Sequence, residues 1–177
     1  IGIAPDYSTD IYNLDSFSRQ DGYGILVILV RPESRGFVSL KNADPLMAPI
    51  IQPNLLSDQR DMEVMIKAMR KAIDVGGSKP MKEFSPGGII FPALPVTDES
   101  LRMHIRKSLE TLYHPVGTCK MGHDEWSVVN DRLQVHGISG LRVADASIMP
   151  SITTGNTNAA CIMIGEKAAD MILEDGE

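Results

Sequence analysis

The segment from Asp58 to Val75 repeats apolar residues every three or four positions, which is the spacing of one face of an α-helix. The apolar positions are Met62, Met65, Ile66, Met69, Ala72 and Ile73. Asp58 and Asp61 lie at the start, where carboxylates accept hydrogen bonds from free helix N–H groups, and Gly76-Gly77 lies at the end. The sequence therefore predicts a long amphipathic helix here.

Two β-strands and a second helix are predicted around this segment. Ile25–Val30 is rich in β-branched residues and Phe37–Leu40 alternates apolar and polar residues, so we expect the two to pair as a β-hairpin. Thr97-Asp98-Glu99 opens a second helix, because negative charge stabilises the positive end of the helix dipole. Its apolar stripe is Leu101, Ile105, Leu109 and Leu112, and it must end before Pro115.

The remaining segments complete a mixed fold. Residues 80–95 contain four prolines and a Gly-Gly pair, which favour an irregular connection and a candidate border of a cleft. Leu141–Ala144 is predicted as a short strand, and Asn158–Leu173 as a helix that is apolar on nearly every side and therefore buried. We expect an α/β fold of mixed (α+β) type, with an antiparallel or mixed sheet backed by helices, then a strand-turn-helix.

Composition excludes several classes of protein. Among 177 residues, 17 Lys and Arg against 23 Asp and Glu give a formal charge of −6, which argues against nucleic acid as a partner. The apolar run Ile25–Val30 is far shorter than the roughly 20 residues that a membrane-spanning helix needs. We expect a soluble chain without its own targeting signal. Two cysteines, Cys119 and Cys161, favour a reducing compartment such as the cytoplasm, with a single disulfide and peripheral membrane association left open.

His114 is the first candidate for a catalytic residue. It precedes Pro115, and a residue before proline is restricted to an extended backbone, so the direction of the imidazole is restricted too. Gly117 and Thr118 follow, which allow a close approach and a local hydrogen bond. An imidazole that can take up a proton near neutral pH suits a general base. The alternative is a histidine at the end of a helix with a structural hydrogen bond, and residue type alone favours that alternative.

The polar turn from Pro150 to Asn158 is the second candidate. It leads from the predicted strand, which Asp145 ends, into the apolar helix. The unpaired N–H groups at the start of that helix would attract negative charge on a ligand. Alternatively, Asn156, Thr157 and Asn158 only cap the helix. The two roles are compatible.

Metal-dependent and hydrolytic sites receive little support. His114, Cys119 and His123 could be imagined as metal ligands, but a fourth ligand at a suitable spacing is lacking, so we expect no metal. His104 is expected to be solvated, and His136 lies in a polar connection. A G-x-S-x-G nucleophile motif does not occur.

Two motifs resemble a known family. YHPVGTCKMG at 113–122 and GLRVADASIMPSITTGNTNAACIMIGEKAADMI at 140–172 are similar to the C-terminal region of the glucose–methanol–choline (GMC) oxidoreductases, and residues 31–72 are similar more weakly. The resemblance extends from about residue 24 to residue 172, with His114 and Asn156 lying 42 residues apart. It implies a substrate-binding portion over residues 1–112, and an active-site loop with the last segment of an FAD-binding domain over 113–177.

The resemblance also implies roles for individual residues. His114 matches the base that accepts the hydroxyl proton of the substrate, and Asn156 matches a second active-site position that is histidine in other members. Asparagine at that position resembles the choline-oxidising and related alcohol-oxidising branch. An amide can hydrogen-bond a substrate oxygen but cannot take a proton at neutral pH. Asp145 and Ala146 would lie near the ribityl and diphosphate groups of FAD, and Thr157 and Asn158 near the isoalloxazine ring.

The family's G-x-G-x-x-G turn, which holds the FAD diphosphate, does not occur in this chain. We therefore expect the N-terminal FAD-binding half of the same protein to be the partner of this region. By itself the chain should bind little FAD, turn over no substrate, and self-associate through exposed apolar surface. The implied activity is oxidation of a small alcohol, which could be choline-like, by hydride transfer to FAD. A lyase of the cyanohydrin-cleaving type and a non-catalytic binding module remain alternatives.

Overall fold

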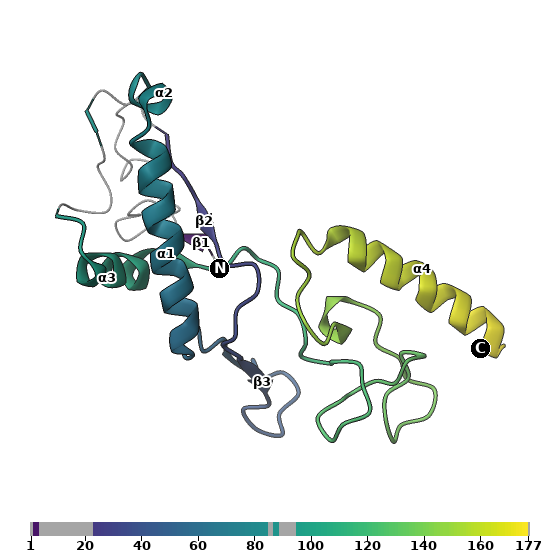
Figure 1. Ribbon diagram of the computed structural model, residues 1–177. Coiled ribbons are helices and arrows are strands. Elements are labelled where there is room, and N and C mark those ends of the chain that lie inside the picture. The colour runs from purple at the N-terminus through teal and green to yellow at the C-terminus, as the bar shows by residue number, and fades with distance from the viewer. Residues whose placement is uncertain (1, 4–22, 85–86, 89–94, 177) are drawn as a thin grey trace. The chain divides into compact units, whose positions relative to one another are not determined.

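The computed structural model describes residues 2–3, 23–84, 87–88 and 95–176 (Figure 1). The chain divides into two compact units, one of residues 1–35 and 54–112, the other of residues 36–53 and 113–177. The elements are β1 (Gly2–Ile3), β2 (Val27–Ile28), β3 (Phe37–Ser39), β4 (Ile50–Gln52), α1 (Gln59–Gly76), α2 (Lys79–Lys82), α3 (Asp98–Ser108), β5 (Leu109–Glu110), the 3₁₀ helix η2 (Ala146–Ile148) and α4 (Asn158–Asp175). The predicted roles of residues 1–112 and 113–177 stay predictions.

The first unit packs two helices on a small antiparallel sheet. Its strands run in the order β2-β1-β5, and Figure 1 shows α1 beside β2. The predicted apolar face of α1 forms the core, because its methionines and Ile66 pack against residues of β2 and α3. The buried members are Val27, Leu29, Met62, Met65, Ile66, Met69, Leu101 and Ile105. The predicted long helix and the mixed fold class are confirmed.

The predicted hairpin of Ile25–Val30 with Phe37–Leu40 is wrong. The strand β2 pairs with β1, and β3 pairs with β4, both in antiparallel register. The connection between β2 and β3 is bound to α1 instead of closing a turn, because the side chain of Asp61 accepts hydrogen bonds from the backbone N–H groups of Glu33 (2.7 Å) and Ser34 (2.9 Å). Asp61 is only 1% exposed, so these two bonds satisfy a buried carboxylate.

The helix α3 starts as predicted and ends earlier than predicted. Thr97 and Ser100 form a reciprocal capping box, since each side chain accepts a hydrogen bond from the other residue's backbone N–H. The helix ends at Ser108, and Leu109 pairs with Ile3 across β5 and β1. Leu109 and Leu112 therefore lie outside the helix, because pairing with the sheet replaces the last helical turn.

The proline-rich connection is only partly described. The short helix α2 begins with Lys79 and Pro80, where the missing proline N–H costs nothing. Residues 85–86 and 89–94 lie outside the described residues, and so does the predicted cleft border there.

The second unit contains the β3–β4 ladder and an irregular segment covered by α4. Gly36 precedes β3 at a close approach, because a Cβ atom there would lie 2.3 Å from the carbonyl oxygen of Gln52. Isolated bridges join Met121 to Val129, Val129 to Val135 and Gln134 to Arg142. Apolar side chains from this irregular segment pack on one face of α4. The buried set is Val129, Leu133, Ile148, Met149, Ile164 and Ala168.

Two predictions for the C-terminal region need correction. The expected strand Leu141–Ala144 is reduced to one antiparallel bridge, between Arg142 and Gln134. Within the described residues, no longer strand lies beside it to extend the pairing. The helix α4 forms as predicted, but it is buried on one face only. Ile162, Met163 and Leu173 are 59%, 55% and 77% exposed in this chain.

Two observations bear on the environment of the chain. In the described ranges, no helix combines the length and the apolar character that crossing a membrane requires. Cys119 and Cys161 are both free and half-buried, so the disulfide left open by the sequence is not formed.

We predict that Asp61→Ala lowers the free energy of unfolding by about 1–3 kcal/mol, since it leaves the N–H groups of Glu33 and Ser34 without an acceptor. Asp61→Asn should fall between this variant and the parent protein, because Glu33 and Ser34 donate to different carboxylate oxygens and asparagine keeps only one of them. Urea denaturation measures the effect, with Glu63→Gln on the exposed face of α1 as a near-neutral control. Equal midpoints for Asp61→Ala and the parent would contradict this role.

Candidate active site

His114 lies on an irregular stretch of the second unit and not at the end of a helix. The helix α3 ends at Ser108, and β5 intervenes. Tyr113, directly before it, has a φ of 59°, which a residue with a side chain adopts only where the fold imposes it. Pro115 follows. The backbone around His114 is therefore restricted on both sides, which limits the directions that its ring can take.

Backbone hydrogen bonds hold the segment after His114 against the 3₁₀ helix η2. The N–H of Cys119 donates to the carbonyl of Ser147 at 3.0 Å, and the N–H of Met121 donates to that of Ile148 at 2.7 Å. Gly117 has a φ of 90°, and a Cβ atom there would lie 3.4 Å from the carbonyl oxygen of Met149. The glycine of the HPVGT motif thus serves the backbone turn that lets this segment approach η2.

The imidazole of His114 contacts Thr157, the residue directly before α4. Its Nδ1 atom lies 2.9 Å from Oγ1 of Thr157. Thr157 is 7% exposed, while His114 is half-buried. This hydrogen bond joins residues 43 positions apart, and it gives both side chains a partner inside the unit.

Thr157 is the N-cap residue of α4 by position, but its side chain makes no capping hydrogen bond. The first backbone bond of α4 runs from the N–H of Cys161 to the carbonyl of Thr157 at 2.9 Å. Within the described ranges, no side chain accepts from the N–H groups of Asn158, Ala159 and Ala160. The start of α4 therefore keeps the free donors and positive dipole end that suit a negatively charged or electron-rich ligand.

In the part of the chain that the structure describes, the other four predicted site residues make no hydrogen bond to His114 or to the hydroxyl of Thr157. Asn156 and Asn158 flank Thr157 in the chain and are exposed. The side chain of Asp145 accepts a hydrogen bond from the N–H of Ser147 at 2.7 Å and so caps η2. Ala146 packs beside the apolar core. All six predicted positions belong to the second unit, but only His114 and Thr157 are brought into direct contact.

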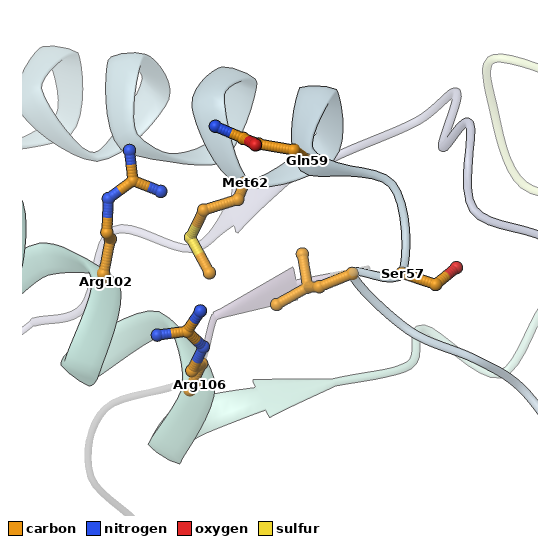
Figure 2. A pocket seen from close by; sticks show the side chains of 6 residues that line it. Ser57, Gln59, Met62, Arg102 and Arg106 are labelled. Atoms are coloured by element: carbon orange, nitrogen blue, oxygen red, sulfur yellow. The ribbon is translucent and has the colours of Figure 1, made fainter.

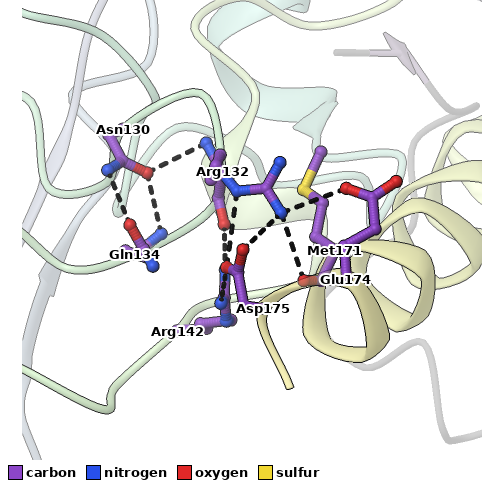
Figure 3. A network of polar contacts seen from close by, with 7 residues as sticks. All are labelled: Asn130, Arg132, Gln134, Arg142, Met171, Glu174 and Asp175. Atoms are coloured by element: carbon purple, nitrogen blue, oxygen red, sulfur yellow. Dashed lines mark hydrogen bonds and ion pairs between the residues drawn. The ribbon is translucent and has the colours of Figure 1, made fainter. Parts of the chain in front are cut away.

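An ion-pair network secures the opposite end of α4 (Figure 3). The guanidinium of Arg132 donates to Asp175 at 2.8 Å, to Glu174 at 3.2 Å and to the backbone carbonyl of Met171 at 3.2 Å. Arg142 donates to the other carboxylate oxygen of Asp175 at 2.5 Å. Hydrogen bonds from Arg142 and then from Arg132 hold the pKa of the Asp175 carboxyl below its usual value. Cations at this end also suit the negative end of the helix dipole.

Two hollows lie elsewhere. In the first unit, Leu56, Ser57, Gln59, Met62, Arg102 and Arg106 border a pocket of about 340 Å³ between α1 and α3 (Figure 2). A guanidinium group has hydrogen-bond donors and no acceptor, so the two arginines of this pocket do not suit the role of a base. In the second unit, a hollow of about 520 Å³ is bordered by Asn130 and residues 134–142. None of the six predicted site residues lines either hollow.

The remaining histidines and cysteines do not form a metal centre in the part of the chain that is described, where no three candidate ligands gather. His136 bonds through Nε2 to the carbonyl of Gly122 at 3.0 Å, so its ring has a structural partner. His123 is exposed.

Sequence reasoning missed what Thr157 does. It treated this residue as a helix cap or a cofactor contact, whereas the hydroxyl bonds to His114. The two motifs could have suggested proximity, since both belong to one resemblance, but nothing in the local pattern distinguishes a capping threonine from one that bonds a distant ring.

We predict that Asp175→Asn lowers the melting temperature of the full-length protein near neutral pH and that this difference shrinks in acid. The folded pKa of Asp175 is depressed, so its stabilisation is present above the unfolded value of about 3.9 and is lost as the pH falls through the folded value. Thermal melts between about pH 6 and pH 3 test this. Asp170→Asn is the control, since its pairing with Lys167 is long and exposed. A difference that does not depend on pH would contradict the ion-pair account.

Known proteins match this chain over most of its length. A family model described as GMC oxidoreductase matches residues 32–165. An oxygen-dependent choline dehydrogenase of Escherichia coli K12 is 44% identical over 162 residues, which are 91% of this chain and 29% of that protein. An alcohol dehydrogenase (acceptor) of Pseudomonas putida is 44% identical over 153 residues, 86% of this chain and 28% of that protein.

Solved structures of other proteins also match this chain. Formate oxidase from Aspergillus oryzae RIB40 superposes with a TM-score of 0.78 at 33% identity, over 85% of this chain and 26% of that one. A fungal aryl-alcohol oxidase superposes with a TM-score of 0.75 at 32% identity, over 83% of this chain and 24% of that one. The chain thus spans under a third of the length of the relatives it matches. On the family match and these relatives, the chain belongs to the GMC oxidoreductase family.

Proposed function

We propose that the protein containing this chain oxidises an alcohol to a carbonyl compound with His114 as the base. The observation that carries the proposal is the contact of His114 with Thr157, in a chain that belongs to the GMC oxidoreductases. Relatives named choline dehydrogenase, alcohol dehydrogenase (acceptor) and aryl-alcohol oxidase support an alcohol as the substrate. A small, choline-like alcohol is the substrate class we would test first.

The geometry supports a defined role for each ring nitrogen of His114. Nδ1 is occupied by the hydroxyl of Thr157, which leaves Nε2 as the atom that can take the hydroxyl proton of the substrate. In the reaction, the O–H bond of the alcohol gives its proton to Nε2, the C–H bond gives a hydride with both its electrons, and a C=O bond forms. FAD, when bound, supplies the acceptor of that hydride.

Asn156 would bind the oxygen of the substrate. It is exposed and lies next to Thr157 in the chain, so its amide is available close to the residue that contacts His114. An amide N–H that donates to the alcohol oxygen stabilises the negative charge that develops there as the proton leaves. Because an amide cannot take up the proton, His114 acts alone as the base.

The residues present fit FAD at the start of α4. The N–H groups of the first turn of α4, which lack a side-chain cap, suit the electron-rich edge of a flavin ring, where negative charge accumulates on reduction. We assign Thr157 and Asn158 to the surroundings of the isoalloxazine ring. Asp145, which uses one carboxylate oxygen to cap η2 and is exposed, would contact the ribityl and diphosphate region together with Ala146.

The N-terminal FAD-binding half of the same protein is the proposed partner of this region. The exposed apolar side chains Ile162, Met163 and Leu173 on α4 support a covering surface of this kind. An isolated chain would therefore self-associate and bind little FAD. The charge of −6 argues against nucleic acid, and the two free cysteines favour a reducing compartment such as the cytoplasm.

We expect His114→Ala to slow reduction of the bound flavin by an alcohol by about 100- to 10,000-fold, because positioned base catalysis is lost. The absorbance of oxidised flavin in the full-length protein, followed after mixing with a panel of alcohols, measures this rate. His123→Ala is the matched control, since that histidine is exposed and lies in the same unit. Bound flavin that no alcohol reduces would contradict the proposed oxidation, and unchanged reduction in His114→Ala would contradict the base.

For Asn156→Ala, kcat/KM for flavin reduction should fall by about 100- to 1,000-fold, the size of effect seen when one donor to a developing negative charge is removed. Ser151→Ala, an exposed residue of the same polar turn, should leave kcat/KM unchanged. The two variants are compared by stopped-flow absorbance with the alcohol that reduces the parent protein fastest. A loss confined to protein yield, with normal kinetics in the purified variant, would argue against this role.

A further inference from the structure

We infer that Thr157 is a positioning residue for His114, and that its hydroxyl oxygen accepts a hydrogen bond from Nδ1–H and so keeps Nε2 unprotonated. This assignment of the hydrogen-bond direction deepens the proposed function and rests on it, because it benefits catalysis only if His114 is the base. It replaces a capping role for Thr157 with a role that acts through the imidazole.

The hydroxyl of Thr157 does not cap its own helix. A threonine at the N-cap position ordinarily accepts a hydrogen bond from an N–H of the first helical turn. Thr157 has this position, but its backbone is helical, with φ −75° and ψ −12°, and its side chain makes no such bond. The hydroxyl instead lies 2.9 Å from Nδ1 of His114 in a site where Thr157 is 7% exposed. The start of α4 therefore lacks a side-chain cap, and the same hydroxyl is a buried hydrogen-bond partner for His114.

The backbone is restricted on both sides of the contact between His114 and Thr157. Threonine is branched at Cβ, which restricts its rotamers, and its carbonyl accepts the first backbone bond of α4. The same helix is packed on the apolar core through Ile164 and Ala168. On the other side, Pro115 restricts the backbone of His114. The hydrogen bond therefore joins two side chains whose backbones are already placed, so little further entropy is lost in forming it.

The position of the ring proton decides which nitrogen of His114 can act as the base. A neutral imidazole carries one proton, on either Nδ1 or Nε2. If the hydroxyl of Thr157 donated to Nδ1, the ring proton would be on Nε2, and that atom could not accept a proton from a substrate. If Nδ1–H donates to Oγ1 of Thr157, the lone pair is on Nε2. The same bond persists after Nε2 has gained its proton, because the cationic ring still carries Nδ1–H.

Of the two arrangements, only the one with Thr157 as acceptor is compatible with a base at Nε2 both before and after proton transfer. Within the described residues, no other group is bonded to the ring of His114. Thr157 is thus the one described side chain that selects the tautomer. The hydroxyl hydrogen of Thr157 remains free to point away from the ring.

The test compares Thr157→Val with Thr157→Ser in the full-length protein. Valine matches the shape of threonine and removes the oxygen, whereas serine keeps the hydroxyl. With histidine labelled by ¹⁵N, and His114→Ala used to assign the signal, the parent and Thr157→Ser should show Nδ1 protonated and Nε2 unprotonated. In Thr157→Val the tautomer is no longer selected. The ¹⁵N shifts of Nδ1 and Nε2 should therefore become more alike, as for a mixture of tautomers, or should change places, as for the Nε2–H tautomer.

The kinetics should follow the tautomer. For flavin reduction by an alcohol, we expect kcat of Thr157→Val to fall about 10-fold with KM nearly unchanged, and Thr157→Ser to restore most of the rate. A Nε2–H tautomer in the parent protein would overturn the inference, and this measurement does not depend on whether Thr157→Val folds. Parent-like ¹⁵N shifts and kcat in a folded Thr157→Val would overturn it as well.

Failure of this inference can be told apart from failure of the proposed function. If no alcohol reduces the flavin of the parent protein, the oxidation is wrong, while the ¹⁵N shifts still report which nitrogen Thr157 keeps protonated. If His114→Ala slows flavin reduction but Thr157→Val does not, the result supports His114 as the base and contradicts the positioning role of Thr157. Equal loss of melting temperature in the serine and valine variants, with kcat and ¹⁵N shifts unchanged, would show a purely structural role and so overturn the inference.

Discussion

The packing of one face of α4 on an irregular apolar core positions the candidate site. Ile164 and Ala168, one helical turn apart, are buried among side chains from residues 129–149. The first residue of the helix is thereby placed, and with it the hydroxyl of Thr157. The segment that follows His114 is held to the same core by two backbone bonds to η2. Without this shared core, nothing would bring His114 and Thr157 within hydrogen-bonding distance.

The two ends of α4 have different tasks. Its C-terminal end is held by Arg132 and Arg142, whose charges satisfy Asp175 and favour the negative end of the helix dipole. Its N-terminal end has no side-chain cap, and among the described residues no side chain accepts from its first N–H groups. The interactions that stabilise the helix are thus concentrated away from the candidate site. A helix that is secured at one end can leave the other available to a ligand without losing its position.

Part of the fold follows from local patterns. The spacing of Met62, Met65, Ile66 and Met69 places α1 correctly, and the Thr97 capping box marks the start of α3, because helices depend on interactions three or four residues apart. Strand pairing was predicted less well. The strand β2 pairs with β1 and β3 with β4, since the partner of a strand is chosen by the whole sheet. The carboxylate of Asp61 binds the backbone between β2 and β3, and the hydrophobic pattern of the sequence does not predict this contact.

For the candidate site too, local sequence predicts some features and tertiary packing decides the others. The sequence by itself determined which residue types are present, that proline restricts the backbone of His114, and that a helix begins after the Gly155-Asn156-Thr157 turn, because these depend on neighbouring residues. Only the tertiary structure decided that the hydroxyl of Thr157 bonds to a histidine 43 positions away and not to its own helix. A hydroxyl gains a similar free energy from either partner. The choice therefore falls to the packing of α4, which sets the distance between the two side chains.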